Sequence, residues 1–404
     1  MNSTDPKRLP QWLLWGILAG LLLVISVGGA ELVLRLVPGP WTSSFFYIYD
    51  PVVGTWHLSS FTGDNLGIDY KIRGVRFNEF GMRDRDRSFE KNLGVTRIAF
   101  LGDSFIEGAQ VGNEEVVTRR METQLGPKVE VLNFGVSGFG TYQALLTYEE
   151  RVRPFKPDIV ILGFYTGNDM RNNLRAVESL YGDASSRPFL EKRDDGSWAA
   201  IPASSKDMSR NAIVLFLKRH FALYRFLWFE KQRFSGMWRL AEPPENSAPS
   251  TQSVESMDAY IARLFAPPKD QPFLGAWEAT EYLIERLKDA VERDGGRFVL
   301  VAIPDPVVFE ADPRASLEKL YNAPLPEEYD PEYPQKRLAR MAGEAGISYV
   351  DLTPAFKSYR DAHALPFPYF AFEHDGHWSA LGHAVAADTI TAHLRDAELK
   401  YAPD

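Results

Sequence analysis

Short apolar runs alternate with amphipathic segments from about residue 96 onward. The runs, rich in β-branched residues, cover residues 97–101, 129–134, 158–164, 297–303 and 349–352. Helical patterns lie between them, over residues 115–125, 141–151, 276–293 and 333–345. Buried parallel strands are nearly continuous apolar runs, and helices connect them. The alternation therefore predicts an α/β fold, a flavodoxin-like three-layer α/β/α sandwich around a central parallel five-stranded sheet.

The N-terminus carries a different pattern. Lys7 and Arg8 precede an uncharged run over residues 12–30, and mostly apolar residues continue to residue 37. A helix needs roughly 20 apolar residues to cross a bilayer, and positive charge before it favours a cytoplasmic N-terminus. We therefore expect a cytoplasmic segment over residues 1–11 and a single transmembrane anchor over residues 12–37. The rest of the chain is expected outside the cytoplasm, in the periplasm or at the cell surface.

Two alternatives exist for the apolar run. Gly28 and Ala30 are small residues suited to cleavage of a signal peptide before Glu31. Cleavage would also deliver the rest of the chain outside the cytoplasm. A buried core helix is the other alternative, and a long uncharged run at the very terminus fits it less well.

Two segments interrupt the alternating pattern. Residues 38–95 mix Gly, Asn, Asp and aromatic residues, and predict an irregular or short-stranded lead-in. Residues 96–396 form the main domain, and its stretch 170–275 is too long for a plain loop, so we expect an insertion there. Residues 242–256 of the insertion are rich in Pro, Ser and Glu and are expected to be flexible.

One part of the insertion is apolar and basic. The positions that fall on one helical face are Val214, Leu217, Phe221, Tyr224 and Trp228. We expect a helix packed on its own domain. The alternatives are a lid over a site or a helix that lies on the membrane surface.

Composition narrows the classes of protein. The 404 residues include 45% hydrophobic and 25% charged residues, which is ordinary for a globular chain. The net charge is −9 without a long basic run, so nucleic acid is not an expected partner. The chain has no cysteine, which excludes disulfides, thiolate–zinc sites and cysteine nucleophiles.

Three residues follow predicted strands at their carboxyl ends, where ligands bind in open α/β sheets. Ser104 follows the first strand, Gly138 the second and Asn168 the third. A serine at a strand-to-helix turn can expose its hydroxyl, and a glycine lets a backbone N–H approach a substrate. The asparagine amide can donate to an oxyanion. Each residue alone also fits a helix cap or a turn.

A cluster near the C-terminus contains three of the seven histidines, His374, His377 and His383. Asp375 can hold the imidazole of His377 through one ring nitrogen and leave the other to accept a serine proton. The rival is a metal site formed by these three histidines and Asp375. No other cluster obviously completes such a site, so we expect neither a metal nor a cofactor.

Together and in this order, these blocks resemble the SGNH (GDSL) hydrolase family. The resemblance covers roughly residues 78–175 and 297–395. Its motifs here are Gly102-Asp103-Ser104-Phe105, Gly138, Asn168 and Asp375-Gly376-His377. It implies Ser104 as nucleophile and His377 as general base. It also implies an oxyanion hole from the N–H groups of Ser104 and Gly138 with the amide of Asn168. Residues 78–84 also resemble a lead-in segment of membrane-anchored members.

The final block departs from the family pattern. Most members place two residues between the aspartate and the histidine, whereas only Gly376 stands here and Trp378 occupies the usual histidine position. The Asp-x-His-Trp-Ser pattern is similar to exported polysaccharide O-acetyltransferases related to the same family. The short spacing leaves Glu373 as a second candidate to orient the base, and His374 as a minor candidate for the base itself.

We therefore expect a serine-dependent esterase that removes an acyl or acetyl group from a glycan or lipid outside the cytoplasm through an acyl-enzyme. The first alternative is an O-acyltransferase that moves an acetyl group to or from an exported polysaccharide. The second is a non-catalytic glycan-binding or scaffold protein, which would not need all five site residues. The expected partners are the acylated substrate and the membrane, and the sequence names no protein partner.

Overall fold

The structure is a computed structural model of the whole chain. It describes residues 10–37, 39–181, 187–204, 212–228, 230–231, 263–310, 312–321, 325, 327–363 and 370–399. The predicted flexible segment over residues 242–256 lies outside these ranges. The chain divides into a large unit, residues 46–210 with 245–404, and a small unit, residues 1–45 with 211–244.

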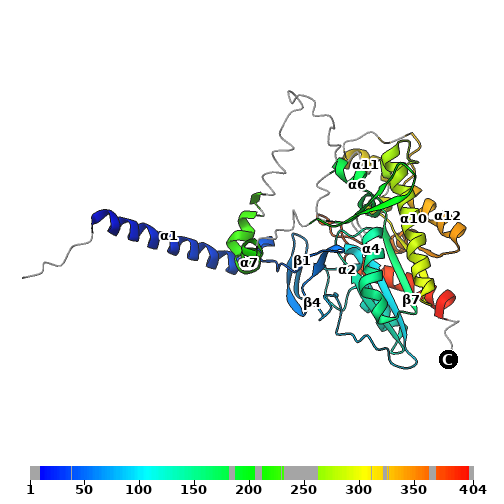
Figure 1. Cartoon of the computed structure of the whole chain (residues 1–404), viewed down its shortest axis with the longest axis horizontal. Coiled ribbons are helices and arrows are strands. Elements are labelled where there is room, and N and C mark those ends of the chain that lie inside the picture. The colour runs from blue at the N-terminus through cyan, green and yellow to red at the C-terminus, as the bar shows by residue number, and fades with distance from the viewer. Residues whose placement is uncertain are drawn as a thin grey trace, which may run out of the picture. The chain divides into compact units, whose positions relative to one another are not determined.

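A parallel sheet forms the centre of the large unit (Figure 1). Its strands are β5 (Thr96–Gly102), β6 (Val129–Gly135), β7 (Ile159–Tyr165), β10 (Arg297–Ile303) and β11 (Ser348–Asp351). They lie in the order β11-β10-β7-β5-β6, and every adjacent pair is parallel. This is the flavodoxin-like order, so the predicted fold class is confirmed. All five predicted strands are present within two residues of their expected bounds.

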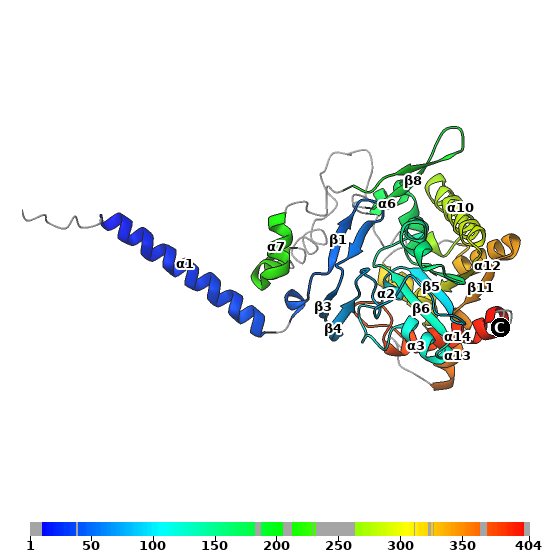
Figure 2. The ribbon, with the colours of Figure 1, turned by 60° about the horizontal axis from the view of Figure 1, so that its bottom comes forward.

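Helices cover both faces of the sheet (Figure 2). One face packs against α4 (Thr141–Thr147), α10 (Gln271–Arg293) and α12 (Tyr333–Ala345). The other packs against α3 (Val117–Leu125), α13 (Thr353–His363) and α14 (Ala380–His393). Successive residues of β5 enter opposite cores, since Ala99 joins the first cluster and Phe100 the second. Two apolar cores thus hold the strand ends in fixed positions.

Helix α10 begins earlier than its apolar pattern predicts. Asp270 caps it by accepting the N–H of Phe273, and Pro272 stands in its first turn. The cap and the proline define the start better than the apolar positions do. After α4, the predicted helix continues as a wider turn, η2 (Tyr148–Val152), and then η3 (Arg153–Phe155).

The lead-in forms two antiparallel pairs, as the expectation of short strands allowed. They are β1 (Tyr47–Asp50) with β2 (Gly54–His57), and β3 (Phe61–Leu66) with β4 (Lys71–Phe77).

The segment after β4 is fixed to the sheet by buried ion pairs. Arg87 donates to Asp84 at 2.8 Å, to Glu122 of α3 at 2.6 Å and to the carbonyl of Val131 in β6 at 2.9 Å. Because these charges are buried and mutually paired, removing one partner would be costly.

Further short elements complete the large unit. They are α2 (Ser104–Glu107), α5 (Asp169–Asn173), α6 (Arg175–Tyr181), β8 (Phe189–Lys192), β9 (Trp198–Ile201), η4 (Pro306–Phe309), α11 (Pro313–Tyr321) and η5 (Leu394–Glu398). Strands β8 and β9 form an antiparallel hairpin.

The small unit contains α1 (Gln11–Leu36), η1 (Pro40–Thr42) and α7 (Ala212–His220). Among the described residues, α1 is the one helix that is long and apolar enough to cross a membrane. Residues 222–228 form a second short helix after α7, so the single helix expected here is wrong. The carboxylate of Glu31 accepts the N–H groups of Ala222 and Leu223 at 3.0 and 2.8 Å. These are free donors at a helix N-terminus, which explains how the end of α1 holds this segment.

Candidate active site

Ser104 stands where β5 passes into α2. Asp103 precedes the helix, and its Oδ1 accepts the N–H of Phe105 at 2.9 Å. The cap ends the strand at Gly102 and places Ser104 at the first position of the helix, with 6% of the residue exposed. The hydroxyl therefore reaches a cavity at the carboxyl edge of the sheet.

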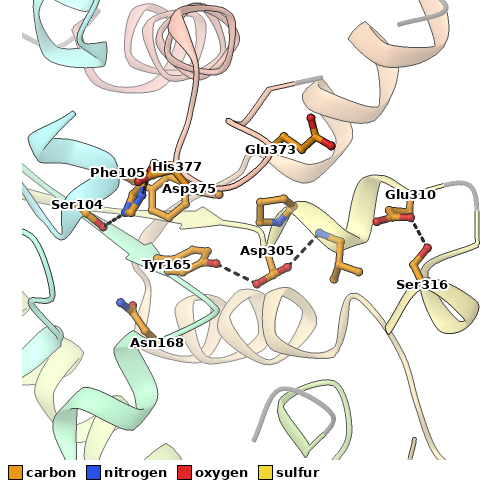
Figure 3. Close-up of a pocket in the computed structure, with 13 residues that line it drawn as sticks. Ser104, Phe105, Tyr165, Asn168, Asp305, Glu310, Ser316, Glu373, Asp375 and His377 are labelled. Atoms are coloured by element: carbon orange, nitrogen blue, oxygen red, sulfur yellow. Dashed lines mark hydrogen bonds and ion pairs between the residues drawn. The ribbon is translucent and has the colours of Figure 1, made fainter. Parts of the chain in front are cut away.

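A hydrogen-bonded chain joins this serine to the C-terminal cluster (Figure 3). Nε2 of His377 lies 2.7 Å from Oγ of Ser104, and Nδ1 of His377 lies 2.5 Å from Oδ1 of Asp375. The loop that carries both residues is closed by the N–H of Phe372, which donates to the carbonyl of His377 at 2.9 Å. The arrangement matches a nucleophile, a base and an orienting carboxylate.

The electrostatics of His377 suit a base. Burial lowers its pKa, but the hydrogen bond and charge of Asp375 outweigh burial, so the pKa is raised above the ordinary 6.5. The neutral ring accepts the serine proton, and Asp375 stabilises the imidazolium that results.

The other residues of the cluster are engaged elsewhere. Glu373 is exposed, and the Nδ1 of His377 pairs with Asp375 rather than with Glu373. The ring of His374 pairs with Asp69 at 2.6 Å. His383 is buried, its Nδ1 accepts the N–H of Val117 at 3.2 Å, and burial lowers its pKa to about 3. Within the described ranges, no group of three His, Cys, Asp or Glu side chains is arranged to hold a metal ion.

The two remaining predicted residues follow the neighbouring strands. Asn168 precedes α5 and lines the cavity with Ser104, and Figure 3 shows its amide nitrogen on the side of Ser104. Gly138 lies between β6 and α4 with a φ of +77°, a conformation that favours glycine. It is not among the residues that line the cavity. Its loop is fixed to α2, since the N–H of Ser137 donates to Glu107 at 2.5 Å.

The cavity has a volume of about 900 Å³. Opposite Ser104 it is lined by Tyr165, Asp305 and Glu310, which the sequence analysis did not single out. The hydroxyl of Tyr165 donates to Asp305 at 2.9 Å. Tyr165 and Asp305 stand at or just after the ends of β7 and β10. Their position at the ends of predicted strands could therefore have indicated that they belong to the site, because the carboxyl ends of parallel strands meet at one edge of the sheet.

A buried acidic pair underlies the serine. Asp103 and Asp169 are both fully buried, and each lacks a partner for one carboxylate oxygen in the described structure. Burial raises the pKa of Asp103 to about 7. Burial, and then the charge of Asp103, raise the pKa of Asp169 well above its ordinary value. The pair therefore retains a proton at a pH where an exposed aspartate has none.

Comparison with known proteins gives a family match for one part of the chain. Residues 268–403 match the family model described as "SGNH hydrolase-like domain, acetyltransferase AlgX". Among curated proteins, none matches this chain.

Solved structures resemble the chain at low identity. One is the acetyl xylan esterase AlAXEase, with 13% identity and a TM-score of 0.38 over 73% of this chain and 98% of that one. Another is a catalytic mutant of the acetylxylan esterase Axe2 from Geobacillus stearothermophilus, with 13% identity and a TM-score of 0.37 over 75% and 96%. A third is a protein from Desulfitobacterium hafniense that is described as a candidate lipolytic protein of the G-D-S-L family. It has 11% identity and a TM-score of 0.36 over 74% of this chain and 99% of that one.

The fold and the family match define an enzyme of the class that cleaves or transfers ester-linked acyl groups. Residues 268–403 are thus similar to an SGNH hydrolase-like family that includes O-acetyltransferases, in agreement with the resemblance that the motifs indicated.

Proposed function

We propose that Ser104 is the nucleophile of a two-step acyl transfer. His377 takes the hydroxyl proton while Oγ attacks the ester carbonyl, and Asp375 orients the ring and stabilises its charge. The N–H groups of Ser104 and Gly138 and the amide of Asn168 stabilise the oxyanion. His377 then protonates the leaving alcohol, and an acyl-enzyme remains. The observation that carries the proposal is the hydrogen-bonded chain from Ser104 through His377 to Asp375.

The proposed substrate is an acetylated or otherwise acylated glycan. The cavity presents the carboxylates of Asp305, Glu310, Glu373 and Asp375, and His377 is the one basic side chain among its described lining residues. Such a wall repels anionic sugars and offers acceptors to sugar hydroxyls. We expect uncharged glycans to be preferred over those with carboxylate or phosphate groups.

Hydrolysis and transfer differ in which hydroxyl reaches the acyl-enzyme. Water completes a hydrolase cycle, and a sugar hydroxyl completes a transferase cycle. Hydrolysis is our leading proposal. The match to a domain described by an acetyltransferase supports transfer as the second candidate, and the matched region includes the block from Asp375 to Trp378.

The enzyme is proposed to act outside the cytoplasm, held by α1 in the membrane with a cytoplasmic N-terminus. The segment over residues 212–228, which is held by the end of α1, lies on the membrane surface in this proposal. It exposes Phe216, Leu227 and Trp228 and carries Lys218 and Arg219. Exposed apolar residues beside basic ones are typical of interfacial helices.

The test uses the full chain in detergent with p-nitrophenyl acetate, longer esters and acetylated xylan, beside the Ser104→Ala variant. Steady Ser104-dependent release in water alone supports a hydrolase. A burst that stalls until a sugar acceptor is added supports a transferase. If no ester gives a Ser104-dependent signal, the scaffold alternative replaces both.

A further inference from the structure

The turn between β3 and β4 contacts the loop that carries Asp375 and His377. Asp69, in this turn, accepts three N–H groups of that loop. Its Oδ2 accepts the backbone N–H of His374 at 2.6 Å and that of Asp375 at 3.2 Å, and its Oδ1 lies 2.6 Å from Nδ1 of His374. One carboxylate thus fixes the backbone on which the orienting aspartate stands.

The neighbouring Tyr70 reaches the side chain of Asp375 itself. Its hydroxyl donates to Oδ2 of Asp375 at 3.4 Å, a long bond, and its ring lies 5.3 Å from that of Phe372. Within the turn, the N–H of Gly67 donates to the carbonyl of Tyr70 at 2.9 Å. The two oxygens of Asp375 are therefore held from both sides, Oδ1 by His377 and Oδ2 by Tyr70.

We propose that Asp69 and Tyr70 are positioning residues for the Asp375–His377 pair. The inference rests on the proposed function. Backbone hydrogen bonds within the loop set its path, and the side chain of Asp375 is held by His377 from the loop and by Tyr70 from the turn. The turn, more than 300 residues earlier in the chain, supplies that restraint. Groups that hold a catalytic side chain in place act on turnover rather than on substrate binding.

The first experiment measures kcat and KM for Asp69→Asn and Tyr70→Phe in the full chain. An amide has one acceptor oxygen, and its NH₂ group would face the N–H donors of the loop, so Asp69→Asn loosens the contact. We expect kcat to fall about 10- to 100-fold for Asp69→Asn and about 3- to 10-fold for Tyr70→Phe, with KM within about 2-fold. Asp64→Asn is the matched control. Asp64 belongs to the same hairpin but accepts from the N–H of Gly74 and pairs with Arg73, so kcat should not change.

The second experiment repeats both substitutions in the Asp375→Asn background. If Asp69 and Tyr70 act through Asp375, neither costs more than about 2-fold once Asp375 is replaced. Losses that multiply, or an Asp69→Asn variant with full kcat, would overturn the proposal and leave the triad intact. If Asp375→Asn alone retains wild-type activity, the proposed triad fails and the positioning role fails with it.

Discussion

Nδ1 of His377 lies 2.5 Å from Oδ1 of Asp375, although only Gly376 separates the two residues. Gly376 has a φ of +79°, in the left-handed region that residues with a side chain rarely adopt. This turn brings the carboxylate back onto the imidazole. The short spacing, which departs from the usual family pattern, therefore produces the same serine–histidine–aspartate contacts.

Gly376→Ala tests whether the turn is needed. A Cβ at this position meets no atom within 4 Å, so its cost is confined to the backbone conformation, about 1–2 kcal/mol. We expect a small fall in the melting temperature and a fall in kcat of about 10-fold, because the loop relaxes away from its geometry. Gly343→Ala is the control, since its Cβ also meets open space but its backbone is helical. Equal kcat in both variants would contradict the assigned role of Gly376.

Asp375→Asn should reduce kcat by about 10²- to 10⁴-fold, because the orienting charge is lost. Glu373→Gln should reduce kcat far less. The pH profile gives a second readout. Protonated His377 cannot accept the serine proton, so activity falls as the pH drops below its raised pKa, and the acid limb lies above pH 6.5. Removing the charge of Asp375 lowers that pKa, and the limb moves to lower pH. A larger effect from Glu373→Gln would transfer the orienting role to Glu373.

The sequence predicted the features that depend on local pattern. Strands β5 and β10 are largely apolar runs, and Ser104 follows the end of β5 after a single residue, Asp103. Features that depend on contacts between distant segments were missed. Nothing near Asp69 in the chain indicates that it lies at the site, and only the tertiary structure brings it there.

The insertion shows the same limit. Apolar residues over 214–228 fit one helical face, but a second helix begins at residue 222. The carboxylate of Glu31 in α1 accepts hydrogen bonds from the first N–H groups of that second helix. Helical periodicity alone does not reveal a break that a distant carboxylate stabilises.

Asn168→Ala tests the oxyanion hole. Loss of one donor to the oxyanion is expected to lower kcat about 10²- to 10³-fold with little change in KM. Asn172→Ala is a poor control because Asn172 is buried. Asn113→Ala is a better control, because Asn113 is exposed, donates to the carbonyl of Gly74 and does not line the cavity. An Asn168→Ala variant that turns over like Asn113→Ala would remove Asn168 from the oxyanion hole.

The membrane proposal can be tested with spin labels, because the natural chain has no cysteine. Single cysteines replace Leu22 in α1, Phe216 in α7 and Leu93 in the large unit, all of which are exposed. In bilayers with anionic lipids, we expect the label at position 22 to be shielded from a water-soluble nickel quencher. The label at position 216 should be partly shielded, and that at 93 fully accessible. Equal accessibility of the labels at positions 216 and 93 to the quencher would refute the surface helix but not the anchor. Accessibility of the label at position 22 would refute the anchor.

Covalent labelling tests directly whether Ser104 is the nucleophile. The full chain is treated with a fluorophosphonate, which reacts with activated serines, and the modified peptide is mapped by mass spectrometry. Ser104→Ala, His377→Ala and the neighbouring Ser137→Ala are treated in parallel. We expect a single adduct on Ser104 that is lost in the first two variants and retained in Ser137→Ala. An adduct on another serine, or labelling that persists in Ser104→Ala, would contradict it.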